Sequence, residues 1–208
     1  MSLLNYYLEI AYKFYPKGVS ELKKEIYSST KENKLLESTK LANIQRNNLQ
    51  WNELLKEVKK RFPDARVYSF DYYLNSYERS FPVCLSFDRK GSKFNFINLV
   101  LHISVLIDSF IVYQTYPEKF STSNDMSFAT YNIEKSVLQD YYKLIEVVES
   151  FFPDHKQFPI EVIEENIPDI MYEGIGIVND KEGNLHAGFQ RQMNLYNAFF
   201  SSQYYYNA

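Results

Sequence analysis

The sequence predicts an α+β fold in a single domain that spans residues 1–208. Two patterns lead to this prediction. Apolar residues recur at helical spacing over residues 1–62, whereas residues 63–208 carry alternating or continuous apolar runs typical of strands, with one long helical stripe among them. A chain of 208 residues, 45% of them hydrophobic, can also bury a core of its own. We therefore expect N-terminal helices followed by an antiparallel sheet meander with one inserted long helix.

Residues 1–62 are predicted to form several separate helices. The first runs from Leu3 to Tyr15, where the Pro-Lys-Gly sequence that follows would end it. Ser20 can cap a short second helix, and residues 29–32, Ser-Thr-Lys-Glu, have the form of a capping box for a new helix toward Leu41. A separate helix is expected to end at Pro63, and its apolar stripe consists of Trp51, Leu54, Leu55, Val58 and Phe62.

The apolar period then changes to that of strands. Residues 67–70 predict a short strand, and residues 83–88 and 94–105 predict a hairpin that turns through residues 89–92. Residues 107–116 predict another strand, which ends before a proline.

The apolar faces of this hairpin restrict its register. If both strands bury one face together, the numbers of paired residues add up to an even number, which favours a loop at residues 90–92 and places Cys84 opposite Asn98. His102 would then lie four residues further along, about 13 Å away. That distance is too long for a cysteine nucleophile and its base.

The last third of the chain predicts one helix and two strands. After a polar loop over residues 121–127, Asn132 can cap a long helix that ends at a proline. Its apolar stripe consists of Val137, Leu138, Tyr141, Leu144, Ile145, Val148 and Phe152. Residues 171–178 and 195–200 predict two strands joined by a turn-rich segment.

The sequence contains no recognisable catalytic or cofactor-binding motif, and we predict no catalytic residue, no metal and no cofactor. Cys84 is the only cysteine, so an internal disulfide is impossible. The histidines His102, His155 and His186 have none of the usual zinc-binding spacings. Residues 174–176, Gly-Ile-Gly, lack the third glycine of a dinucleotide-binding loop.

Charge is divided unevenly along the chain. The net charge is −3, but residues 13–66 hold 13 basic and 7 acidic residues, whereas residues 118–208 hold 6 basic and 14 acidic residues. Because the pI is about 5.7 and no recognition motif is present, no nucleic-acid partner is predicted. The chain starts without a signal-peptide pattern, and its most apolar stretch, residues 97–113, is interrupted by polar residues, which favours a cytoplasmic protein without a membrane span.

Two groups of residues are candidates for binding a protein partner. The acidic residues near the C-terminus could attract a basic surface, and tyrosines provide large contact area at low entropy cost. The candidates are Glu161, Glu164, Glu165, Asp169 and Glu173, together with Tyr72, Tyr73 and Tyr77. A solvated acidic face that binds nothing, and a tyrosine content raised by AT-rich codons, would produce the same composition.

Three short stretches resemble the immunity proteins that accompany bacterial polymorphic or type VI secreted toxins. They are residues 14–18 (Phe-Tyr-Pro-Lys-Gly), residues 167–170 (Ile-Pro-Asp-Ile) and residues 195–200 (Leu-Tyr-Asn-Ala-Phe-Phe), the last as a closing strand. The order of elements is similar along most of the chain. The resemblance implies a cytoplasmic antitoxin-like protein, active in competition between bacteria, that binds one toxin domain tightly and blocks its active site or its access to substrate.

The acidic C-terminal third agrees with that role, since it could cover the basic cleft of a nuclease or of another effector with such a cleft. Two alternatives remain open. One is a metal-assisted hydrolase whose ligands are scattered carboxylates and histidines, and the other is a scaffold protein that oligomerises through its aromatic surface. The sequence defines no oligomeric state.

Overall fold

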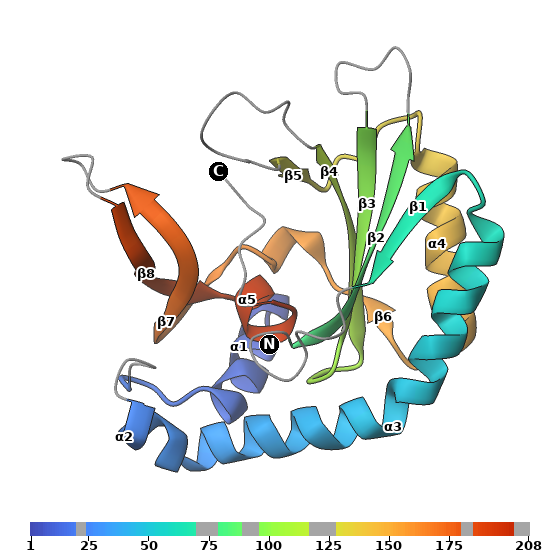
Figure 1. The fold of residues 1–208 in the computed structure, drawn as a ribbon. Helices are drawn as coiled ribbons and strands as arrows, with labels where there is room; N and C mark the ends of the chain where they lie inside the picture. The colour runs from blue at the N-terminus through green and yellow to red at the C-terminus, as the bar shows by residue number, and fades with distance from the viewer. Residues whose placement is uncertain (20–23, 70–78, 89–95, 117–127, 180–184, 202–208) are drawn as a thin grey trace.

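The computed structural model confirms the α+β class and describes residues 1–19, 24–69, 79–88, 96–116, 128–179 and 185–201 (Figure 1). Within these ranges, the side chains of residues 24, 128–129 and 172–191 are not described. The chain begins with helices α1 (Leu3–Phe14), α2 (Lys24–Ser29) and α3 (Lys31–Arg61). Strands β1 (Ala65–Ser69), β2 (Ser80–Asp88), β3 (Phe96–Ser104), β4 (Ser109–Tyr116) and β5 (Phe128–Thr130) follow. The remaining elements are α4 (Leu138–Phe151), β6 (Lys156–Gln157), the 3₁₀ turn η2 (Ile160–Val162), β7 (Asn166–Asn179), β8 (Leu185–Asn194) and α5 (Leu195–Phe199).

Helix α3 joins two predicted helices into one. It runs for 31 residues, about 46 Å, because neither proline nor glycine interrupts residues 31–61. Its N-cap is Thr30 rather than Ser29, since the Thr30 hydroxyl accepts the N–H of Asn33 at 3.2 Å. The predicted end before Pro63 is confirmed.

The strands β1 to β5 form the predicted antiparallel meander in sequence order, and the short β6 adds to β4 in parallel. The even parity of the β2–β3 register is confirmed, but the register itself is shifted by two residues. Cys84 pairs with Val100 instead of Asn98, which leaves His102 two residues beyond this pair instead of four. The predicted turn over residues 89–92 lies outside the described residues, as do the predicted cap Ser20 and the loop over 121–127.

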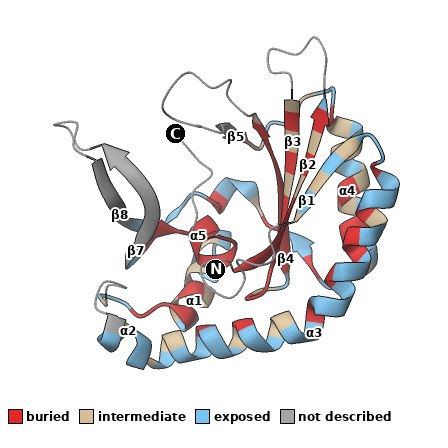
Figure 2. Cartoon of the chain, viewed as in Figure 1, coloured by how far each residue is buried: buried red, intermediate tan, exposed pale blue. Residues whose placement is uncertain are grey.

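Both faces of the sheet are buried, each under different elements (Figure 2). On one face, odd-numbered residues of β2 and β3 such as Val83 and Leu101 pack with α3 and α4, where Trp51 stacks on Phe81 with ring centroids 5.2 Å apart. On the other face, β4 residues such as Tyr113 pack with α1, α5 and the segment from Phe158 to Ile170. We refer to the cluster on the α3 and α4 side as the first core and to the cluster on the α1 and α5 side as the second core. Side chains alternate along the shared strands, so the two cores have these strands in common.

The predicted start of the long helix in the last third of the chain is wrong. Asn132 does not cap α4, which begins at Leu138 without a side-chain cap. The intervening residues are held at the edge of β4 instead: the Glu134 N–H donates to Gln114 Oε1 at 2.8 Å, and its carboxylate accepts the Tyr116 hydroxyl at 2.5 Å. These tertiary hydrogen bonds delay the start of the helix.

The predicted closing strand over residues 195–200 is the helix α5. Asn194 caps this helix, because its side-chain oxygen accepts the N–H of Asn197 at 2.9 Å. All five residues of α5 are buried, so the sequence shows no amphipathic period. The partner of β7 is β8, and this hairpin extends away from the six-stranded sheet (Figure 1).

Candidate functional site

Four of the predicted partner-binding residues lie on one segment that runs from η2 into the first residues of β7. Glu161, Glu164, Glu165 and Asp169 are all exposed, and we refer to them together as the acidic face. The apolar residues that alternate with them point into the second core and anchor the segment: Val162, Ile163, Ile167 and Ile170. The same short sequence thus provides an anchor and a charged outer surface.

Backbone hydrogen bonds fix the acidic face to distant parts of the chain. The N–H groups of Leu195 and Tyr196, at the start of α5, donate to the carbonyls of Glu165 and Ile163 at 3.1 and 2.9 Å. The N–H of Gly18 donates to the Asp169 carbonyl at 3.0 Å. Asp169 has a φ of 62°, in the left-handed region that aspartate tolerates better than most residues.

The charges of the acidic face have no ion-pair partner among the described residues. The ion pairs within that part of the chain lie in α3, and they join Lys31 to Glu32, Lys56 to Glu53, and Glu57 to Lys60 and Arg61. The Lys17 ammonium lies 3.7 Å from the centre of the Tyr12 ring. Burial and the charge of Asp169 raise the pKa of Tyr12.

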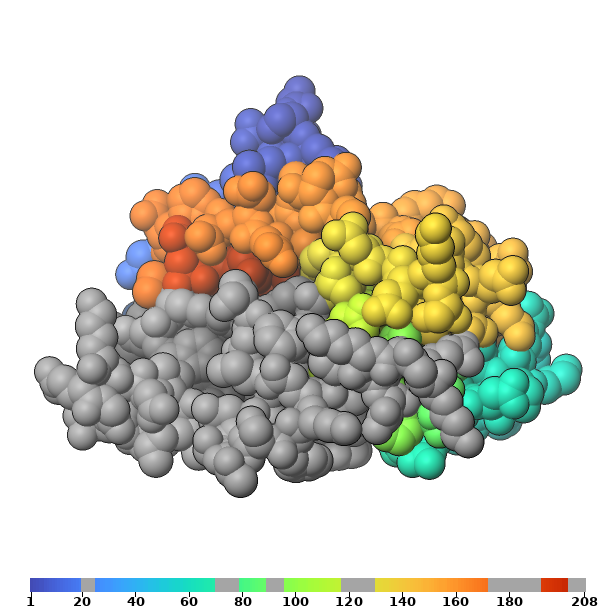
Figure 3. Space-filling view, turned by 90° about the horizontal axis from the view of Figure 1, so that it is seen from above, coloured from blue at the N-terminus to red at the C-terminus, as the bar shows by residue number. Residues whose placement is uncertain are grey.

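Helix α1 borders the acidic face on the outer surface, where Figure 3 shows the segment after α4 beside the N-terminal helix. Tyr6 and Ile160 are both exposed, and Tyr7 connects the two elements. The Tyr7 ring contacts Tyr6 at 5.1 Å and Phe158 at 4.3 Å. Partial burial, the neighbouring Tyr6 and the charge of Glu161 raise the pKa of Tyr7.

The side chains of the other four predicted binding residues lie outside the described set. Glu173 lies in the β7–β8 hairpin opposite Gln190, beyond the anchored segment, and its side chain is outside the described set. Tyr72, Tyr73 and Tyr77 also lie outside the described residues.

His102 lies at the centre of a buried hydrogen-bond network and is 1% exposed. The Ser80 hydroxyl donates to the Phe200 carbonyl at 2.7 Å and lies 2.8 Å from His102 Nδ1. Because Ser80 has one hydroxyl proton, Nδ1 carries the imidazole proton and donates it to Ser80. His102 Nε2 then accepts from Tyr113 at 3.2 Å, and Tyr196 lies 3.2 Å from the Tyr113 oxygen.

This network contains a serine and a histidine in contact, as catalytic pairs do, but both side chains are buried away from solvent. Ser80 is fully buried, and its proton is directed to a backbone carbonyl. Burial lowers the pKa of His102 to about 3 and raises that of the Cys84 thiol to about 12, so both groups are neutral at physiological pH. The arrangement can therefore position α5 against the sheet.

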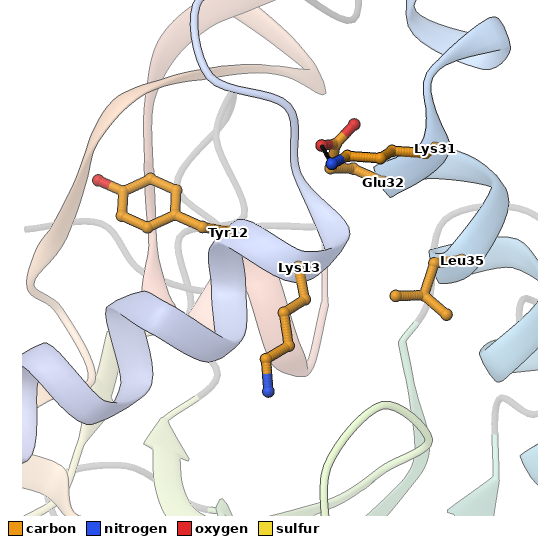
Figure 4. A pocket seen from close by; sticks show the side chains of 5 residues that line it. All are labelled: Tyr12, Lys13, Lys31, Glu32 and Leu35. Carbon is orange, nitrogen blue, oxygen red and sulfur yellow. Dashed lines mark ion pairs between the residues drawn. The ribbon is translucent and has the colours of Figure 1, made fainter.

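Two hollows of moderate size lie among the described residues. One has a volume of about 360 Å³ between α1 and α3, and Figure 4 shows Tyr12 and Lys13 on one side and Lys31, Glu32 and Leu35 on the other. The second has a volume of about 430 Å³ and is lined by Arg46, Asn47, Gln50, Asp108, Phe152, Pro153, Asp154 and His155. In the part of the chain that the structure describes, no three His, Cys, Asp or Glu side chains are placed to hold a metal ion.

Sequence reasoning missed the second hollow because its residues come from three separate segments. Arg46, Asn47 and Gln50 share one face of α3 at helical spacing, which is the signal that could have drawn attention to them. Asp108 follows β3, and His155 follows α4.

Comparisons with protein-family models, with curated proteins and with solved structures find no match to this chain. Among the described helices, none is both long enough and apolar enough to cross a membrane.

Proposed function

We propose that this chain is a non-enzymatic immunity protein of the cytoplasm that binds a cognate secreted toxin domain and blocks its active site. The observation that carries the proposal is the acidic face: four exposed carboxylates on a segment anchored to α5 and to Gly18, without ion pairs to other described side chains. The short resemblances to toxin immunity proteins supply the class of partner.

An anchored surface is suited to tight binding. Because the backbone of the acidic face is already ordered by hydrogen bonds to α5, binding costs less conformational entropy than the ordering of a free loop would. Unpaired carboxylates also speed the encounter with a basic surface and disfavour acidic competitors. A toxin with a basic active-site cleft, such as a nuclease, is the partner that this charge favours.

Apolar side chains beside the acidic face can provide the buried contact area that charged residues do not. Exposed Tyr6 and Ile160 adjoin the acidic face, and the contact of Tyr7 with Phe158 supports this part of α1. Interfaces commonly combine aromatic anchors with a charged surround. We infer that these two side chains contact the toxin beside its basic cleft.

The test is a double charge reversal, Glu164→Lys with Glu165→Lys, measured against the cognate toxin domain. We expect affinity at low salt to fall at least about tenfold, and the salt dependence of binding to weaken, because favourable charge pairs are replaced by repulsion. Growth rescue on co-expression with the toxin should decrease in parallel.

A matched control separates the acidic face from net charge. Glu146→Lys with Glu149→Lys makes the same change in charge on the exposed side of α4, and it should leave affinity close to that of the natural chain. Equal effects of the two double variants, or unchanged affinity and salt dependence in the first, would overturn the role of the acidic face. Failure of the natural chain to co-purify with the toxin would overturn the proposed function itself.

A further inference from the structure

The hollow between α3, the end of α4 and the β3–β4 connection has the features of a ligand site separate from the acidic face. Its volume of about 430 Å³ lies in the range of small-molecule sites, roughly 300 to 1,000 Å³. Unlike a cleft that exposed side chains merely border, it is lined by two polar residues that are almost completely buried. These are Asn47 and His155, each only 6% exposed.

Asn47 presents an unused hydrogen-bond donor to this hollow. Its side-chain oxygen accepts from Arg46 Nε at 3.3 Å, whereas its amide nitrogen donates to no described residue. This nitrogen is not among the buried side-chain atoms that lack a partner, so it is accessible from the hollow and is hydrated when the hollow is empty. A ligand that accepts a hydrogen bond can replace that water.

His155 is held firmly in the wall of the hollow. Its ring makes an edge-to-face contact with Phe152 at 5.1 Å, and its backbone N–H donates to the Phe152 carbonyl at 3.0 Å. Burial lowers the pKa of the imidazole, against the opposing effects of Asp108 and of a hydrogen bond to the Ser104 carbonyl. The ring is therefore neutral at physiological pH, and the charges around it are those of the other lining residues.

Charges of both signs converge on the hollow. Arg46, Asp108 and Asp154 all line it, and all three act electrostatically on His155. With the imidazole neutral, the lining carries two negative charges and one positive charge. A simple anion would meet the two carboxylates, and a simple cation would meet the guanidinium.

We propose that this hollow binds a small zwitterion, an α-amino acid. The ammonium group lies between the carboxylates of Asp108 and Asp154, and the ligand carboxylate accepts from the Arg46 guanidinium and the Asn47 amide. Phe152 and Pro153 form the apolar wall for the ligand side chain. This assignment satisfies the unused Asn47 donor and compensates charges of both signs.

The experiment is a titration of the full chain with each of the twenty standard amino acids at up to about 10 mM, followed by amide chemical shifts in NMR. We expect saturable shifts at Asn47, Asp108 and His155 with at least one of them. For the amino acid that binds, the N-acetyl and the α-carboxamide derivatives should each bind at least about tenfold more weakly, since each lacks one of the two charges.

Two variants localise the binding, and one serves as control. Arg46→Met and Asp154→Asn should each weaken binding about tenfold or more, whereas Arg61→Met, an exposed change on the same helix, should not. Absence of saturable shifts with all twenty amino acids would overturn the proposal. So would full affinity for either blocked derivative, or full affinity in the Arg46 and Asp154 variants. None of these outcomes depends on binding to a toxin.

Discussion

Burial keeps His102 neutral, and the free energy of unfolding therefore depends on pH. Its pKa is about 3 in the folded chain, against about 6.5 for an ordinary histidine, so the unfolded chain binds a proton that the folded chain does not. The free energy of unfolding therefore carries the full His102 contribution above about pH 6.5 and loses up to about 1.4 kcal/mol per pH unit below it, down to about pH 3.

We predict that His102→Gln unfolds in urea with a weaker pH dependence than the natural chain. Between about pH 7.5 and pH 5, the natural chain should lose about 2 kcal/mol more than the variant, because only the natural chain has this histidine to protonate on unfolding. The imidazole resonances of His102 should also stay constant over this range in the folded state. A titration midpoint near 6.5 would contradict the neutral assignment.

The identity of this network could not be predicted from the sequence. Ser80 and Tyr113 lie 22 and 11 residues from His102, and Tyr196 lies 94 residues away. The apolar pattern predicts that His102 lies in a strand, but it does not predict which side chains form hydrogen bonds with its ring. The acidic face was predictable for a simple reason: carboxylates without partners stay in solvent, and the alternating isoleucines fix which side is buried.

Among the elements, α5 depends most on contacts that other parts of the chain supply. The Ala198 carbonyl accepts the Tyr15 hydroxyl at 2.7 Å, and the Phe199 carbonyl accepts the Ser104 hydroxyl at 2.7 Å. A helix of five residues has few internal hydrogen bonds and is unstable alone. Its position is therefore determined by α1 and by the ends of β2 and β3.

We predict that Tyr15→Phe lowers the free energy of unfolding by about 1 to 2 kcal/mol, because the variant keeps the ring but leaves a buried carbonyl without this donor. Urea unfolding measures the change. Tyr6→Phe is the matched control in α1, the helix that ends just before Tyr15, and the exposed Tyr6 side chain should contribute less than about 0.5 kcal/mol. Equal effects of the two variants would contradict the role of the Tyr15 hydrogen bond.

Elements with a clear period were predicted well, and those without one were not. The apolar stripes of α1 and α3 and the alternating faces of β2 and β3 define both type and buried side. A register shift by two residues leaves every side chain on the same face, so the pattern could not distinguish Val100 from Asn98 as the partner of Cys84. Helix α5 is buried on all sides, and its aromatic residues gave the prediction of a strand.

At the scale of the molecule, two cores share one sheet. Leu101 and Val112 pack in the first core, while Val100 and Tyr113, their neighbours in β3 and β4, pack in the second. Neither core can lose its strands without removing a wall of the other. The single domain predicted for residues 1–208 stays a prediction.

We predict that both cores unfold in one cooperative transition. Trp51 is the only tryptophan and lies in the first core, so its fluorescence reports there, while hydrogen exchange of the α5 amides reports on the second. Because β3 and β4 serve both cores, the unfolding free energies from the two probes should agree within about 0.5 kcal/mol. Tyr15→Phe, a change in the second core, should then shift the Trp51 transition as much as it shifts exchange in α5. A Trp51 transition that this substitution leaves unmoved would show that the two faces of the sheet unfold as separate units.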